Sequence, residues 1–194
     1  MMEEIRLCYV DGETLMEQPQ EPRRFCINTL LPQGLCILGG SPKVGKSWLV
    51  LDWCLRIARG ERIWGMETIQ GTTLYLCLED SDDRIRLRLS LMTEEVTKNI
   101  CFATASGTLA DTLEEQINFF LRERPDTVLI VIDTFQIIRA NSGDPTYSGD
   151  YQEMQKLKQI ADRLHLTILL VHHLRKQDDR DPFNRFSGTT GITG

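Results

Sequence analysis

The segment from residue 40 to residue 47 reads Gly40-Ser41-Pro42-Lys43-Val44-Gly45-Lys46-Ser47. It matches the pattern G-x-x-x-x-G-K-[ST] and stands between an apolar run at 35–38 and an amphipathic stretch at 46–59. Glycines let the backbone wrap closely around phosphate groups, and the amides that open the following helix attract negative charge. The segment therefore predicts a phosphate-binding loop, in which Lys46 contacts the terminal phosphates and Ser47 offers its hydroxyl to Mg²⁺. The residues expected to bind nucleotide are Gly40, Ser41, Pro42, Lys43, Val44, Gly45, Lys46, Ser47 and Trp48.

Outside this loop, short apolar runs alternate with longer amphipathic stretches. We expect strands at 35–38, 73–78, 100–103, 128–132 and 167–171, and helices at 46–59, 81–93, 109–123 and 150–164. Because the strands are apolar throughout, they favour a mostly parallel central sheet with helices on both faces. The sequence thus predicts an α/β domain at 26–194, preceded by an N-terminal arm at 1–25. Asp80 is expected to cap the helix at 81–93, and Gly60 to end the helix at 46–59.

Composition narrows the functional classes. The 194 residues include 22 Lys and Arg against 28 Asp and Glu, so the formal charge of −6 repels polyanions and any nucleic-acid contact must be local. The sequence contains neither a signal peptide nor an apolar run long enough to span a membrane, which predicts a cytoplasmic protein. The six cysteines form no C-x-x-C pair and are expected to be buried free thiols.

Acidic residues and histidines follow three of the predicted strands. Asp133 ends the run at 128–132, where ligands sit in open α/β sheets, and is expected to hold Mg²⁺ through water alongside Ser47. Glu79 ends the run at 74–78 and could take a proton from an attacking water, with Asp80 as the rival candidate. His172 and His173 end the last strand, and one of them could contact the γ-phosphate.

Four segments in this order resemble the RecA-like ATPases, and within them the RepA-type replicative helicases of plasmids and phages, which are relatives of the DnaB helicases. The segments are 40–48, Leu-Glu-Asp at 78–80, Val-Ile-Asp-Thr at 131–134 and Val-His-His-Leu-Arg-Lys at 171–176. The resemblance implies a RecA-like core that binds ATP and Mg²⁺ between subunits of a ring, usually a hexamer. It makes Glu79 the catalytic base, Lys46 the phosphate-binding lysine, Asp133 the Walker B acid and His173 the sensor.

The resemblance also implies that the loops at 137–149 and 174–190 touch single-stranded DNA. Relatives continue with further strands after a segment like 187–194, so we expect this chain to be truncated at its C-terminus and to lack its arginine finger. Arg84, Arg86 and Arg88 are spaced by two, so we do not expect them to form one helix face; we expect surface charges or subunit contacts.

Three functions fit these patterns. The first is an ATP-hydrolysing, ring-forming motor of DNA replication in a plasmid, phage or mobile element. The second is a non-catalytic module that uses ATP only to control assembly. The third is a small-molecule kinase, which the lack of an arginine-rich lid disfavours, just as the lack of an N-K-x-D segment disfavours a GTPase.

Overall fold

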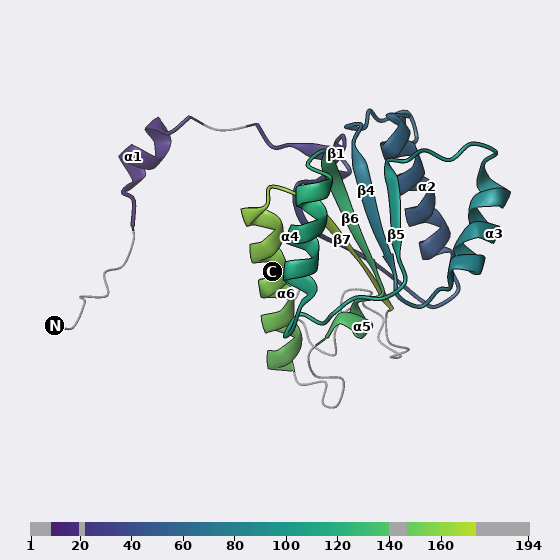
Figure 1. The fold of residues 1–194 in the computed structure, drawn as a ribbon. Coiled ribbons are helices and arrows are strands. Elements are labelled where there is room, and N and C mark those ends of the chain that lie inside the picture. The colour runs from purple at the N-terminus through teal and green to yellow at the C-terminus, as the bar shows by residue number, and fades with distance from the viewer. Residues whose placement is uncertain (1–8, 20–21, 140–146, 174–194) are drawn as a thin grey trace.

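The computed structural model describes residues 9–19, 22–139 and 147–173 (Figure 1). Its main sheet has five parallel strands in the spatial order β3-β7-β6-β4-β5. In chain order the strands are β3 (Gly34–Gly40), β4 (Thr72–Cys77), β5 (Ile100–Ala103), β6 (Thr127–Asp133) and β7 (Thr167–His173). The bounds agree with the sequence prediction to within two residues at each end, and the predicted α/β class with a parallel sheet is confirmed.

Helices cover both faces of this sheet, as Figure 1 shows. One face packs against α2 (Lys46–Arg59) and α3 (Asp82–Met92), and the other against α4 (Leu113–Glu123), α5 (Phe135–Ile138) and α6 (Tyr147–Arg163). Alternate residues of β6 divide between two cores: Leu129 and Val131 join the α2 side, whereas Ile130 and Ile132 join the α4 and α6 side. Burial on both faces explains why consecutive residues in the middle of β6 and β7 are apolar, without alternation between apolar and polar side chains.

The helix predictions are accurate for α2 and less so for α4. Gly60 ends α2 with a φ of 72°, and its N–H bonds to the carbonyls of Arg56 and Ile57, as a left-handed glycine cap does. The helix expected from 109 begins only at Leu113. Residues 109–112 form a turn before it, in which the Leu109 N–H donates to the Ile138 carbonyl at 2.8 Å and so connects this turn to α5.

The sequence prediction missed several short elements. These are α1 (Gly12–Glu17), capped by the Asp11 side chain, the short helix α5 (Phe135–Ile138), and an antiparallel pair made by β1 (Phe25–Ile27) and β2 (Leu31–Pro32). Each is too short to show a hydrophobic period. No residue of α1 is buried, and the division into an arm at 1–25 and a domain at 26–194 stays a prediction.

Two further expectations concern cysteines and membranes. The five cysteines within the described residues are free thiols; Cys26, Cys54 and Cys77 are buried, while Cys36 and Cys101 are half-buried. Burial raises the pKa of the Cys26 thiol to about 12, so this sulfur stays protonated and unreactive. Cys8 lies outside the described residues. None of the helices in the described ranges has the length and apolar character needed to cross a bilayer.

The N-terminus of α3 differs from the prediction. Ser81, rather than Asp80, is its cap, since the Ser81 hydroxyl accepts the Arg84 N–H. Asp80 instead pairs with Arg84 at 3.0 Å and with Arg88. Arg84 and Arg88 are four residues apart and so share one helix face, and the Arg88 guanidinium lies 5.7 Å from the centre of the Trp48 ring. Arg88 is therefore an internal contact between α3 and α2, and the expectation of a surface charge is wrong for this residue.

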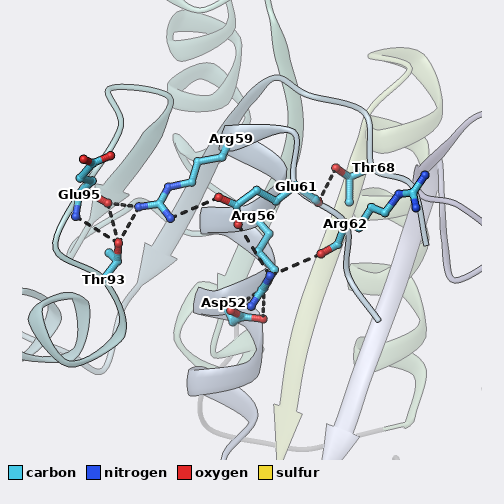
Figure 2. Close-up of polar contacts among 8 residues, drawn as sticks. All are labelled: Asp52, Arg56, Arg59, Glu61, Arg62, Thr68, Thr93 and Glu95. Carbon is cyan, nitrogen blue, oxygen red and sulfur yellow. Dashed lines mark hydrogen bonds and ion pairs between the residues drawn. The ribbon is translucent and has the colours of Figure 1, made fainter. Parts of the chain in front are cut away.

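Polar contacts also involve the C-terminal end of α2 (Figure 2). Arg56 donates to Asp52 at 2.9 Å, one turn earlier in the helix. Arg59 donates to the Thr93 hydroxyl at 2.6 Å and to the Glu95 carbonyl, both in the segment after α3. Cations at a helix C-terminus also interact favourably with the helix dipole, so Arg56 and Arg59 stabilise this end of α2. The opposite end of α2 follows the predicted phosphate-binding loop.

Replacing Leu170 by alanine tests the core of the sheet. Leu170 is fully buried in β7, so Leu170→Ala should lower the free energy of unfolding by about 3 kcal/mol in a urea titration. Leu91→Ala, at a leucine that is 69% exposed on α3, is the matched control and should leave the midpoint near that of the wild type. Equal effects of the two substitutions would contradict this packing.

Replacing Arg88 by alanine tests the contact between α3 and α2. The side chains of Arg88 and Asp80 are only 18% and 9% exposed, so Arg88→Ala leaves a largely buried carboxylate with a weaker set of partners. We expect a loss of about 2 kcal/mol in the free energy of unfolding. Arg86→Ala on the same helix removes a side chain that is 81% exposed and should change little. A larger effect at Arg86 would show that α3 is oriented differently.

Candidate functional site

The predicted phosphate-binding loop joins the end of β3 to the start of α2. Gly45 has a φ of 91° and directly precedes the helix, so a residue with a Cβ would be strained there. Residues 41–45 are exposed, whereas Lys46 is 7% exposed and begins α2. The loop therefore leaves its backbone open to a ligand at the positive end of a helix.

The Lys46 ammonium lies across the loop. It donates to the carbonyls of Gly40 at 2.8 Å and Ser41 at 2.9 Å. Burial lowers the pKa of Lys46, while the negative charges of Asp133 and Glu79 act in the opposite direction. The Lys46 cation thus lies within electrostatic range of two carboxylates, an arrangement suited to a ligand that carries Mg²⁺ and several negative charges.

His173 connects Lys46 with Glu79. The Lys46 ammonium lies 3.2 Å from His173 Nδ1, and His173 Nε2 lies 3.8 Å from a carboxylate oxygen of Glu79. Because an ammonium can only donate, Nδ1 accepts, and in the neutral ring the proton is then on Nε2, which faces Glu79. The Glu79 side chain is 54% exposed and can reach solvent. Three of the predicted site residues, one from α2, one from β7 and one from the turn after β4, therefore lie in one contact series.

Asp133 lies at the end of β6, in register with Cys77 of β4 and Val171 of β7. It is 6% exposed, and one of its carboxylate oxygens accepts a hydrogen bond of 2.7 Å from the Tyr75 hydroxyl. The same hydroxyl is 3.4 Å from the Ser47 carbonyl, so Ser47 and Asp133 flank one phenol group. The Ser47 hydroxyl and the Asp133 carboxylate are hard oxygen donors of the kind that Mg²⁺ prefers.

Tyr75 is a site residue that the sequence prediction missed. Burial and the nearby negative charge of Asp133 raise its pKa far above the ordinary value of a phenol, so Tyr75 remains a hydrogen-bond donor. A tyrosine inside a fully buried strand is the signal that could have identified it, because a buried hydroxyl needs a partner.

The structure separates the two rival carboxylates. Asp80 is 9% exposed and held by Arg84 and Arg88, whereas Glu79 is half-exposed beside His173. Glu79 is therefore the better placed of the two to meet a water molecule. Of the predicted DNA loops, 174–190 lies outside the described residues, while 137–149 is described only at its ends, which belong to α5 and α6.

Comparisons with known proteins agree with this architecture. The model of the AAA domain family matches residues 4–179. The DNA repair protein RadA of Chlamydia pneumoniae is 26% identical over 148 residues, and RadA of Streptococcus pneumoniae is 23% identical over 165. These matches cover 75% and 81% of this chain, which spans only 29% and 34% of the relatives.

A solved structure shares the fold. The ATPase domain of G40P superimposes with a TM-score of 0.60 at 13% identity, over 81% of this chain and 66% of that one. The five-stranded parallel sheet with helices on both faces is the RecA-like arrangement of that ATPase domain. The chain belongs to the AAA domain family and has the RecA-like P-loop ATPase fold.

Proposed function

We propose that this chain binds Mg²⁺ and ATP and hydrolyses ATP as the motor domain of a DNA-processing protein. The observation that carries the proposal is the contact series from Lys46 through His173 to Glu79, beside Asp133. A loop that only joined a strand to a helix would not require a buried lysine, a histidine and a half-exposed carboxylate at one edge of the sheet.

Each residue has a role that its position supports. The amides of the loop and Lys46 would bind the β- and γ-phosphates, taking the place of the lysine's contacts to Gly40 and Ser41. Ser47 and Asp133 would hold Mg²⁺, which neutralises phosphate charge when bound. Trp48 and the other loop residues would complete the nucleotide contacts.

Glu79 would act on the attacking water. Its carboxylate would accept a proton as the water oxygen bonds to the γ-phosphorus and the bond to ADP breaks. His173, which contacts both Glu79 and Lys46, would sense whether the γ-phosphate is present. Loss of that phosphate would change the charge next to Lys46 and so the orientation of the imidazole.

The DNA partner and the oligomeric state of the chain belong to the same proposal. RadA is named as a DNA repair protein, which supports DNA as the partner, and we expect single-stranded DNA and a ring of identical chains, with six as the expected number. Within this class we propose the RepA or DnaB type of helicase, with a role in replication of a plasmid, phage or mobile element. The predicted cytoplasmic location is consistent with such a role.

Two substitutions separate binding from hydrolysis. Lys46→Ala should abolish binding of a fluorescent ATP analogue because it removes the cation from the loop. Glu79→Gln should preserve that binding but lower turnover at least ~100-fold, because an amide cannot accept the proton from water. The measurements are nucleotide titration and phosphate release.

The matched controls are Lys98→Ala and Glu94→Gln, both at exposed positions away from the loop. These variants should bind and hydrolyse ATP like the wild type. Binding through Lys46 without turnover in the wild type at any concentration would instead identify the non-catalytic assembly module.

The proposed ring leads to a further prediction, about how turnover depends on protein concentration. If subunits share the ATP site, phosphate release per chain should rise with protein concentration and rise again when single-stranded DNA is added. The check is a turnover series over a ~100-fold range of concentration, with sedimentation of the same samples. Turnover per chain that stays constant, with a monomer throughout, would contradict a shared site.

A further inference from the structure

Tyr75 is a buried polar side chain whose hydroxyl contacts the Asp133 carboxylate and the backbone of Ser47, the two residues proposed to hold Mg²⁺. It is 1% exposed in the middle of β4, next to Val131 of β6 and Phe102 of β5. Its hydroxyl is 2.7 Å from a carboxylate oxygen of Asp133 and 3.4 Å from the carbonyl of Ser47. The phenol has one hydrogen, and the shorter contact identifies Asp133 as its main acceptor.

This hydrogen bond restricts the Asp133 carboxylate. Asp133 is 6% exposed, so its oxygens depend on protein partners rather than on bulk water for hydrogen bonds. Both residues belong to neighbouring strands that pair in register, Tyr75 with Val131 and Cys77 with Asp133, so the donor and the acceptor are fixed by the sheet. The phenol therefore selects one orientation of the carboxylate and leaves its second oxygen for another partner.

We propose that Tyr75 is a positioning residue for the magnesium site: its hydroxyl orients the Asp133 carboxylate toward the cation that Asp133 and Ser47 hold. This inference rests on the proposed function, since it concerns the metal of that site. Carboxylates that hold a metal are usually fixed by hydrogen bonds of their own, and loss of such a partner commonly weakens metal binding 10- to 100-fold.

Tyr75 also has a packing role, which must be distinguished from the role of its hydroxyl. Its ring lies 6.2 Å from the Phe102 ring, at an interplanar angle of 43°. Tyr75→Phe keeps the ring and deletes only the oxygen. Phe102→Leu disturbs the packing around Tyr75 and keeps the hydroxyl, so it is the matched control for a structural effect.

The test measures how Mg²⁺ affects nucleotide binding. A fluorescent ATP analogue is titrated into the wild type, Tyr75→Phe and Phe102→Leu, first in EDTA and then at increasing Mg²⁺ concentration. In EDTA the three proteins should bind the analogue with affinities within about twofold of each other. The Mg²⁺ concentration for half-maximal effect should rise about tenfold in Tyr75→Phe and stay unchanged in Phe102→Leu.

The outcomes separate this inference from the proposed function. An unchanged Mg²⁺ dependence in Tyr75→Phe, or an equal shift in Phe102→Leu, would overturn the positioning role even if the wild type hydrolyses ATP. A tenfold shift in Tyr75→Phe alone would support that role even if no phosphate is released, in which case only the hydrolytic function would fail. Binding by the wild type that does not respond to Mg²⁺ would overturn the inference as well.

Discussion

Parallel hydrogen bonding between β3, β7, β6 and β4 makes these strands end at the same edge of the sheet, and the candidate site depends on this constraint. In the paired strands Gly40 lies beside His173, Asp133 beside Val171, and Cys77 beside Asp133. The residues that follow or end these strands must therefore meet, although Lys46 and His173 are 127 positions apart in the chain. A shift of β7 by one residue would turn His173 to the other face of the sheet, and its contacts with Lys46 and Glu79 would be lost.

The helices on the two faces complete this arrangement. Two sets of aliphatic side chains, one on each face of the sheet, fix α2 on one side and α4 and α6 on the other. Arg59 anchors the far end of α2, and Arg88 of α3 packs over Trp48 near its beginning. The proposed phosphate-binding loop is thus held between a strand and a helix that both pack into the core, which suits a ligand that must be positioned accurately.

Much of this fold could be predicted from the sequence because it depends on strong local signals. Five apolar runs and one glycine-rich loop define the parallel sheet, and the same logic places Asp133 and Glu79 at its edge. Local signals do not report contacts between distant segments. The Leu109 amide bonds to Ile138 at the end of α5, and Asp80 pairs with two arginines while Ser81 caps α3, contacts that no local pattern shows. The role of Tyr75 depends on β4 lying beside β6, which no stretch of sequence shows by itself.

In the proposed function, Lys46, Ser47, Asp133, Glu79 and His173 form one site for Mg²⁺ and ATP. The most direct test is a crystal structure of the chain with Mg²⁺ and a non-hydrolysable ATP analogue. In such a crystal we expect Lys46 to leave the carbonyls of Gly40 and Ser41 and contact the terminal phosphates, with the cation between Ser47 and Asp133. A nucleotide bound elsewhere, with Lys46 still bonded to both carbonyls, would contradict it.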